Sequence, residues 1–373
     1  MISPLHRFNQ VASLARDWIA PGQAIVQWTH FVTSACNARC RHCFYPINQR
    51  QNELTLEEIE RFLGTVPPIR LLLFSGGEPF LRKDLPEIVN LYYKHSNCFT
   101  ASIPTNGYSS DRICSAVERI IRVAPGLQLG ITVSLDGMKD FHDDVRQVPG
   151  LWDRAVDTVR AAKRLSRDLP GLTVGVNTVF MRDNQTDLQP LLEFVHSELR
   201  PTFHALSFIR GRPLGDARLA SELDVDRYLE LSRWLDSRYS SNDEWSGGWR
   251  GVRARVRHAL SRQRYEYIAR QARGGAFERP CLAGEREYVL SETGDLFGCE
   301  LISDRLGNVR EANFDFSNIQ RGAARSTFIH ERIERNCRCT HECNVRTMLF
   351  FDRRNAFPLI SAAIRIDNGP RDP

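Results

Sequence analysis

The chain has 373 residues, of which 42% are hydrophobic and 25% are charged, a composition that suits one large globular domain or two moderate ones. This composition excludes a disordered chain, a collagen-like fibre and a small disulfide scaffold, and no apolar run is long enough for a transmembrane helix. The net charge of +5 is too small to indicate nucleic-acid binding by itself. The unusual number is that of the cysteines: there are ten, and most of them lie in two short stretches.

Residues 1–24 form an N-terminal extension in which we expect a short amphipathic helix that packs on the rest of the protein. Charged and amide side chains interrupt its apolar residues, so it lacks the uninterrupted apolar segment of a secretory signal. We therefore expect a cytoplasmic protein, whose thiols remain reduced. In that compartment, closely spaced cysteines favour metal or redox chemistry over disulfides.

Short β-branched segments alternate with amphipathic segments from residue 25 to about residue 215. The expected strands are Ile25–Phe31, Ile69–Phe74, Cys98–Ile103, Gln128–Leu135, Leu172–Phe180 and Phe203–Ile209. The expected helices between them are Thr55–Leu63, Leu85–Lys94, Asp111–Val123, Trp152–Leu165 and Asp187–Leu199. Strict alternation predicts a parallel sheet with right-handed crossovers. Since the units are too few for an eight-stranded barrel, we predict an α/β fold with a partial, open (β/α)6 barrel.

Polar or glycine-rich residues follow most of these strands. A cysteine-rich loop follows the first strand, Ser75–Pro79 the second, Thr105 and Asn106 the third, and Ser134–Gly137 the fourth. Because the carboxyl ends of parallel strands meet at one edge of the sheet, these residues are expected to share one site. This organisation indicates an enzyme.

A helical linker region is expected over residues 216–279, with helices at Val225–Tyr239 and Val252–Arg270. Eight arginines lie between residues 250 and 273, against a single acidic residue, Glu266. A solvated arginine face is the simpler interpretation, and a surface for an acidic or phosphorylated partner is the alternative.

The first group of cysteines is a C-x3-C-x2-C array made of Cys36, Cys40 and Cys43. Thiolates are the usual ligands of iron–sulfur clusters, and three of them leave one iron of a four-iron cluster open to another ligand. A zinc site completed by His42 is the alternative.

With these motifs in this order, about residues 25–210 resemble the core of the radical S-adenosylmethionine (radical SAM) superfamily, and we place the core domain at residues 25–215. The resemblance implies that Cys36, Cys40 and Cys43 hold a [4Fe–4S] cluster whose open iron is chelated by S-adenosylmethionine. Reductive cleavage of that cofactor gives a 5′-deoxyadenosyl radical, which abstracts a hydrogen atom from the substrate.

The same resemblance implies roles for residues at the ends of the strands. Gly76, Gly77, Glu78 and Pro79 match the motif that receives the methionine amino group, and Phe44 would lie near the adenine. Ser134 and Asp136 match residues that contact the ribose or the carboxylate, and Asn106 and Asn177 are weaker matches. Asp136, His142 and Arg146 are candidate catalytic residues, and none of them is singled out as the base.

The second group of cysteines begins with a C-x12-G-x4-C pattern from Cys281 to Cys299, which contains a predicted β-hairpin, and ends with Cys337, Cys339 and Cys343. Residues 280–350 resemble the SPASM or the shorter twitch extension of radical SAM enzymes, followed by a C-terminal tail at residues 351–373. The resemblance implies an auxiliary [4Fe–4S] cluster.

Five thiols are enough for the four ligands of one auxiliary cluster and leave one spare thiol. Either Cys337 or Cys339 would be the ligand at one of the four positions. Two clusters would need other ligands such as His330 or His341, and a zinc knuckle is a further alternative. Cys98 and Cys114 are interpreted as small buried hydrophobic residues.

These features predict an oxidoreductase that uses the auxiliary cluster in the oxidation, crosslinking or epimerisation of a peptide substrate. The alternative is a dehydrogenase or rearranging enzyme that acts on a small molecule such as a sugar or an aminocyclitol. Expected partners are an external electron donor such as flavodoxin or ferredoxin and, since only about 25 residues precede the first strand, a separate leader-binding protein. No nucleic acid is expected as a partner.

Overall fold

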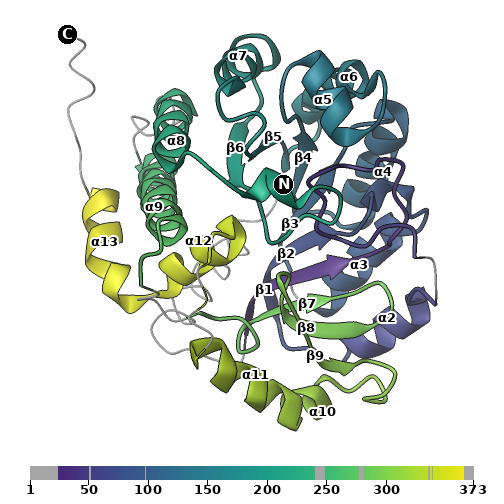
Figure 1. Ribbon diagram of the computed structural model, residues 1–373. Coiled ribbons are helices and arrows are strands. Elements are labelled where there is room, and N and C mark those ends of the chain that lie inside the picture. The colour runs from purple at the N-terminus through teal and green to yellow at the C-terminus, as the bar shows by residue number, and fades with distance from the viewer. Residues whose placement is uncertain are drawn as a thin grey trace.

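The computed structural model describes residues 24–49, 52–96, 98–239, 248–276, 281–334, 337 and 339–364 (Figure 1). The helix expected in the N-terminal extension lies outside these residues, as does the end of the expected C-terminal tail. The tail is helical as far as it is described, because α13 covers Ala356–Ile364.

A nine-stranded sheet runs through the molecule in the order β6-β5-β4-β3-β2-β1-β7-β8-β9. The strands are β1 (Ile25–Phe31), β2 (Ile69–Ser75), β3 (Thr100–Thr105), β4 (Gln128–Ser134), β5 (Leu172–Phe180), β6 (Phe203–Phe208), β7 (Glu287–Leu290), β8 (Asp295–Cys299) and β9 (Ile302–Asn308). All pairs from β6 to β7 are parallel, and the last two pairs are antiparallel. Since β1 and β6 are not paired, strands β1 to β6 form an open, partial barrel, which confirms the predicted fold class.

Helices connect the parallel strands and cover one face of the sheet, as Figure 1 shows for α2 to α6. The helices that join successive strands are α2 (Leu56–Leu63), α3 (Leu85–His95), α4 (Ser110–Val123), α5 (Lys139–Arg146), α6 (Leu151–Asp168) and α7 (Leu188–Phe194). Helix α2 begins with the expected cap: Thr55 and Glu58 form a reciprocal capping box. Helix α5 was not among the expected helices, because it has only eight residues and most of them are polar.

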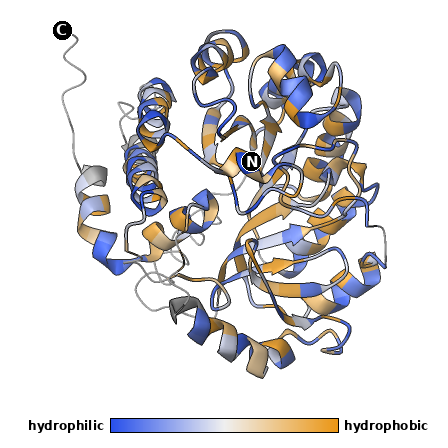
Figure 2. Cartoon of the chain, viewed as in Figure 1, coloured by the Kyte–Doolittle hydropathy of each residue, from blue (hydrophilic) through white to orange (hydrophobic). Residues whose placement is uncertain are grey.

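The alternation of burial along the strands shows which face points away from the helices. In β4, Leu129, Ile131 and Val133 are fully buried, whereas Thr132 and Ser134 are half-buried. The fully buried side chains pack under the connecting helices, and the half-buried side chains face the inside of the partial barrel. The strands are largely apolar, while the helices around them carry polar outer faces (Figure 2).

The cysteine-rich C-terminal region shares the sheet of the barrel. Strand β7 pairs with β1 in parallel, with Trp28 opposite Tyr288. The Trp28 ring also contacts Phe62 of α2 and Phe316 of α10 (Phe316–Gln320), and its indole donates a hydrogen bond of 2.8 Å to the Tyr92 hydroxyl. Aromatic pairs of this kind add stabilisation beyond the apolar area that they bury. The barrel and the hairpin therefore share a hydrophobic core across the boundary that was placed at residue 280.

Helix α12 (Glu342–Phe351) bridges β1 and β6, the first and last strands of the partial barrel. Its Asn344 and Thr347 hydrogen-bond the Gln27 side chain of β1, at 3.1 and 3.2 Å. At the other edge, the Glu342 carboxylate accepts a hydrogen bond from the Phe208 amide of β6. A helix thus closes the gap that a strand would close in a complete barrel.

The remaining helices lie on the side of the molecule away from α2 and α3 (Figure 1). They are α8 (Val225–Tyr239), α9 (Gly248–Ala272) and α13, and α9 contacts both others as well as α12. Helix α11 (Ala323–Glu334) packs against β9. The arginine-rich α9 is not a uniformly solvated face, because the guanidinium of Arg264 is buried over the ring of Tyr265. Within the described residues, no helix is long and apolar enough to span a bilayer.

Candidate active site

The first three cysteines lie on a loop that follows β1, and the loop is fixed by the segments around it. Its Arg39 and Arg41 amides donate hydrogen bonds to the backbone of α5, at 3.2 and 2.8 Å. The Arg41 guanidinium is paired with three carboxylates from three different segments, Asp144, Asp183 and Asp216, at 3.0 to 3.1 Å. These contacts hold the loop over the carboxyl ends of the strands.

The thiols of this loop are half-buried and free of disulfides. Burial raises the pKa of Cys36 to about 11 and that of Cys40 to about 12. The Arg146 guanidinium, whose Nη1 lies 3.9 Å from the Cys40 sulfur, opposes this effect. A cationic centre bound among these sulfurs would stabilise the thiolates further, as metal coordination does. The donor set therefore fits an iron–sulfur cluster.

Gly76 and Gly77 follow β2 and lie directly on the cysteine loop. A Cβ atom on Gly76 would stand 2.3 Å from the Thr33 carbonyl oxygen, and one on Gly77 would stand 2.3 Å from that of Ala35. Gly76 also has a φ of +134°, which is open to glycine alone. The amides of Gly77 and Glu78 each donate a 2.8 Å hydrogen bond to these carbonyls. The two glycines thus allow two backbones to meet without side chains between them.

The Glu78 carboxylate joins this turn to the end of β3. It accepts hydrogen bonds from the Thr105 hydroxyl at 2.9 Å, from the Asn106 amide at 2.7 Å and from the Phe80 amide at 3.2 Å. The Asn106 side chain in turn donates to Asn37 of the cysteine loop at 2.7 Å. Burial raises the pKa of Glu78 to about 7, against the opposing effect of its hydrogen bonds. Glu78, Pro79 and Asn106 therefore gather at the same edge of the sheet as the cysteines.

The three candidate catalytic residues form one buried network behind the cysteine loop. Arg146 donates to Asp136 at 2.7 to 2.8 Å, and the Asp136 amide donates to His142 Nδ1 at 3.2 Å. The other carboxylate oxygen of Asp136 accepts from the Val179 amide at 3.0 Å. Burial alone would raise the pKa of Asp136, but the Arg146 guanidinium holds it below its ordinary value.

The imidazoles of this network are neutral. Burial lowers the pKa of His42 and of His142 to about 4 each. His42 Nε2 lies 3.7 Å from the Asp136 carboxylate. A carboxylate that is already paired on both oxygens is poorly placed to take a proton from a substrate. The network is better suited to hold the loop that carries Cys40.

Ser134 and Asn177 lie side by side on the inner face of the barrel. They are register partners in β4 and β5, and the side-chain amide oxygen of Asn177 accepts a 2.6 Å hydrogen bond from the Ser207 hydroxyl of β6. Phe44 is half-buried beside Cys43. These residues stand where a molecule that lies across the carboxyl ends of the strands would meet them.

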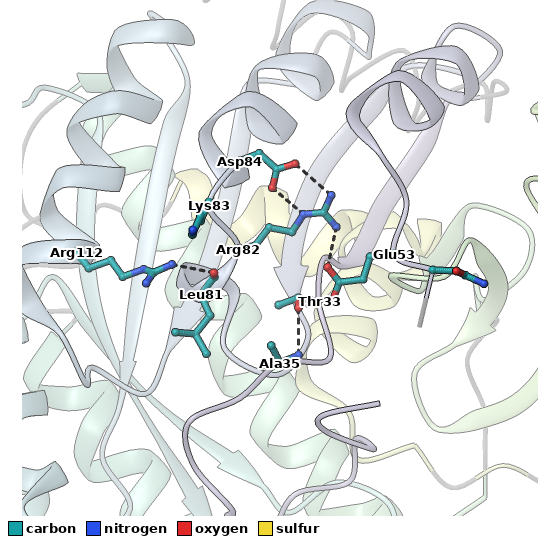
Figure 3. Close-up of a pocket in the computed structure, with 9 residues that line it drawn as sticks. Thr33, Ala35, Glu53, Leu81, Arg82, Lys83, Asp84 and Arg112 are labelled. Carbon is teal, nitrogen blue, oxygen red and sulfur yellow. Dashed lines mark hydrogen bonds and ion pairs between the residues drawn. The ribbon is translucent and has the colours of Figure 1, made fainter. Parts of the chain in front are cut away.

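A pocket of about 670 Å³ lies beside the cysteine loop, between Thr33 and Ala35 on one side and the segment after Pro79 on the other (Figure 3). Arg82 extends between Asp84 and Glu53, and it donates to the backbone carbonyls of Val32 and Leu54 at 2.7 and 2.6 Å. Arg82 therefore links the end of β1, the glycine turn and the start of α2. No motif surrounds Arg82, so this role could not be predicted from the sequence.

The C-terminal thiols lie in two environments. Cys299, at the end of β8, has Cys281, Cys337 and Cys339 as neighbours. Burial raises the pKa of Cys299 and of Cys339, and the charges of the neighbouring thiolates raise it further. Cys343, in the first turn of α12, has basic neighbours instead: Arg210 Nη2 lies 3.8 Å from its sulfur.

Among the residues that the structure describes, no three His, Cys, Asp or Glu side chains converge on a point that would hold a single metal ion. A four-iron cluster is larger than one ion, and each of its thiolates binds a different iron atom.

The family model described as the radical SAM superfamily matches residues 31–195, which run from the end of β1 to the end of α7. Among curated proteins, the chain is similar to the Fe-coproporphyrin III synthase of Methanosarcina barkeri, with 29% identity over 221 residues, or 57% of this chain and 52% of the relative. It is 23% identical to the AdoMet-dependent heme synthase of Oleidesulfovibrio alaskensis over 308 residues, or 79% of this chain and 74% of the relative. The chain thus spans about half of the first relative and about three quarters of the second.

Among solved structures, the fold is similar to that of Streptococcus suis SuiB bound to the precursor peptide SuiA. The TM-score is 0.55 at 14% identity, and the match covers 87% of this chain and 71% of the other. At this level of identity the likeness concerns the fold, and it extends beyond the barrel into the C-terminal region.

Proposed function

The chain is a radical SAM enzyme, and on that premise we propose that it is an oxidoreductase with two iron–sulfur centres that acts in the cytoplasm. A [4Fe–4S] cluster on Cys36, Cys40 and Cys43 and S-adenosylmethionine together supply the 5′-deoxyadenosyl radical. The observation that carries the proposal is the meeting of the cysteine loop, the Gly76–Gly77 turn and the Glu78–Asn106 link at one edge of the sheet.

In this proposal each part of the site has a separate task. The Gly76–Gly77 turn and Glu78 receive the methionine part of the cofactor, since a buried carboxylate next to a side-chain-free backbone suits an ammonium group. Asn106, Ser134 and Asn177 position the rest of the cofactor, and Phe44 lies against the adenine. Asp136, His142 and Arg146 are positioning residues, because their charges are already paired behind Cys40.

The substrate that we favour is a small molecule of the tetrapyrrole class. The support is the similarity to two curated relatives whose names state heme or coproporphyrin synthesis, one of which spans most of this chain. A peptide substrate, with a separate leader-binding protein, is the second candidate. It is supported by the shared fold with a peptide-bound enzyme over 87% of the chain.

An auxiliary [4Fe–4S] cluster on the C-terminal thiols would accept an electron from the substrate radical that hydrogen abstraction leaves, and a flavodoxin or ferredoxin would reduce the first cluster. The experiment is to incubate the anaerobically reconstituted protein with S-adenosylmethionine and dithionite and to measure 5′-deoxyadenosine. Its formation supports the proposal, and its absence at full iron content contradicts it. Adding iron–coproporphyrin III then tests the substrate class: a mass change of the porphyrin supports the first candidate, whereas an unchanged porphyrin contradicts it.

A further inference from the structure

A segment that follows β6, residues 211–220, lies against the cysteine loop, and the proposed mechanism gives it no task. The Leu214 amide donates a 2.7 Å hydrogen bond to the Cys43 carbonyl oxygen, and the Asp216 amide donates one of 2.8 Å to that of Arg41. Two such bonds, each two residues apart in both segments, are typical of a short antiparallel pairing. The post-β6 segment is therefore paired with the part of the loop that ends in the third cysteine.

Leu214 is exposed although the segment around it is fixed. Pro213 and Leu219 are buried, and a Cβ atom on Gly215 would stand 2.7 Å from the Arg41 carbonyl oxygen of the loop. The Leu214 side chain is nonetheless 64% exposed. A single exposed leucine is common on protein surfaces. This one is set apart by its place, because one backbone hydrogen bond joins it to a residue that carries a cluster thiol.

The surface around Leu214 is basic. The cysteine loop and the post-β6 segment together carry the arginines Arg39, Arg41, Arg212 and Arg218 and a single acidic residue, Asp216. Two further carboxylates, from α5 and from the segment after β5, pair with Arg41. Arg39 and Arg212 are exposed, and neither forms an ion pair within the part of the chain that the structure describes. The Arg218 side chain is 78% exposed and pairs with Asp216.

We propose that Leu214, with Arg39, Arg212 and Arg218, is the docking surface for the electron donor of the first cluster, and that the donor is a small acidic electron-transfer protein. The inference rests on the function proposed above, because the electron acceptor is the cluster on the first three cysteines. One electron passes from the reduced donor to that cluster, the donor is oxidised by one electron, and no bond forms or breaks.

Two features of this surface favour such a partner. Electron transfer slows steeply with distance, and a protein seated on Leu214 is separated from the Cys43 backbone by one hydrogen bond. Unpaired cations beside an apolar contact attract an acidic partner and speed its encounter. The pocket of Figure 3 also reaches the loop, at Ala35, but its Arg82 is already paired with two carboxylates. That pocket provides the control.

Docking is tested by titrating oxidised flavodoxin into the reconstituted holoprotein in a calorimeter. Leu214→Asp removes the apolar contact and adds a repulsive charge, so it should weaken binding at least about tenfold. Arg212→Glu should weaken it about fivefold, and raising the salt from about 0.05 M to about 0.5 M should weaken binding to the unaltered protein. Lys83→Glu, a charge reversal at an exposed residue of the pocket, should change it less than about twofold.

The second measurement is the rate of cluster reduction, followed by the loss of visible absorbance in a stopped-flow instrument. Reduced flavodoxin and dithionite are compared, because dithionite is a small molecule that needs no docking surface. Leu214→Asp keeps the backbone amide that bonds Cys43, so iron content and reduction by dithionite should match the unaltered protein. Reduction by flavodoxin should slow at least about tenfold. Equal slowing with both reductants overturns the inference, since the change would then act on the loop itself.

The same measurements with a ferredoxin distinguish the two kinds of acidic carrier. Dependence on Leu214 and Arg212 with either carrier supports the docking surface, and independence with both carriers overturns it. An effect of Lys83→Glu larger than that of Arg212→Glu overturns it as well, in favour of the pocket. Absence of 5′-deoxyadenosine with dithionite, together with flavodoxin binding that depends on Leu214, would contradict the proposed function alone. Normal cleavage with dithionite and unchanged carrier binding in Leu214→Asp would contradict this inference alone.

Discussion

The two groups of clustered thiols in this protein are built in different ways. Cys36, Cys40 and Cys43 lie on one loop, which is held by backbone contacts to α5 and by the glycine turn after β2. The C-terminal group is assembled from separate segments: Cys281 precedes β7, Cys299 ends β8, and Cys337 and Cys339 precede α12. The first group depends on a single loop conformation, and the second depends on the packing of the hairpin and α12 on the barrel.

The two groups illustrate two ways in which a fold can form a metal site: from one short loop or from distant segments of the chain. A short loop brings its ligands together by spacing, and the neighbouring residues only need to fix the loop. Ligands from distant segments meet only after the chain has folded, so their site is coupled to the stability of the whole C-terminal region. We therefore expect substitutions in the first group to abolish chemistry locally, and substitutions in the second to act through structure as well.

The largest effect is expected from the combined substitution Cys36→Ala, Cys40→Ala and Cys43→Ala. The variant should lose one cluster, so that its iron content falls from about eight to about four atoms per chain. Formation of 5′-deoxyadenosine should fall at least about 1000-fold, because no open iron is left to bind the cofactor. Cys339→Ser is the matched control: it should lose a similar amount of iron and still cleave S-adenosylmethionine. Cleavage by the triple variant would contradict the assignment of the first site.

A large effect on stability is expected from Arg146→Met. The change leaves the Asp136 carboxylate buried without its cationic partner, and breaking a buried pair in this way costs about 3–5 kcal/mol. Urea unfolding of the protein without its clusters measures this cost. Arg119→Met removes an exposed ion pair with Glu87 and serves as the control, with an expected loss below about 1 kcal/mol. Equal losses in the two variants would show that the Asp136 network does not fix the cysteine loop.

The buried Glu78 predicts a pH dependence of stability in the protein without its clusters. Its pKa is about 7 in the folded chain and ordinarily 4.5, so the folded state holds a proton that the unfolded state releases between these pH values. The free energy of unfolding should therefore fall as the pH rises from 4.5 to 7, by about 3 kcal/mol from this group. Glu78→Gln should remove this contribution, whereas the exposed Glu193→Gln should leave it in place. An unchanged slope in Glu78→Gln would contradict the prediction.

The sequence identified local features well and long-range ones poorly. Strands β1 and β5 begin and end at the expected residues, because β-branched and apolar residues mark them clearly. The cysteine loop and the Gly76–Gly77 turn were found because their spacing is itself the signal. The predicted hairpin is present, but its pairing with β1 was not foreseen. Strand pairing between residues some 260 positions apart leaves no local pattern.

The same limit applies to single residues that act at a distance. Arg82 and Arg210 connect segments that are far apart in the chain, and no motif surrounds either of them. Asp136 was predicted to lie near the cysteines from its position after β4, and its pairing with Arg146 depends on α5, a helix that the sequence did not reveal. Spacing could not decide which of Cys337 and Cys339 is a cluster ligand, since both lie in the segment that precedes α12.

The last comparison, which includes the smallest expected effect, concerns two glycines that are equally crowded, one near each thiol group. A Cβ on Gly77 would meet the Ala35 backbone at 2.3 Å, and a Cβ on Gly298 would meet the Phe328 ring at 2.3 Å. The Ala35 backbone is part of the cysteine loop and cannot move without moving Cys36, whereas a ring can turn about its side-chain bonds. We expect Gly77→Ala to cost about 3 kcal/mol and Gly298→Ala about 1 kcal/mol in urea unfolding.

Iron content separates the two sites further. Gly77→Ala should lower the iron of the first cluster, while Gly298→Ala should leave the auxiliary iron in place despite its position next to Cys299. If Gly298→Ala is the more damaging change, the hairpin is the more rigid of the two structures. The C-terminal site would then be fixed by its local turn, as the first site is, and the contrast between a loop-built and a packing-built site would not hold.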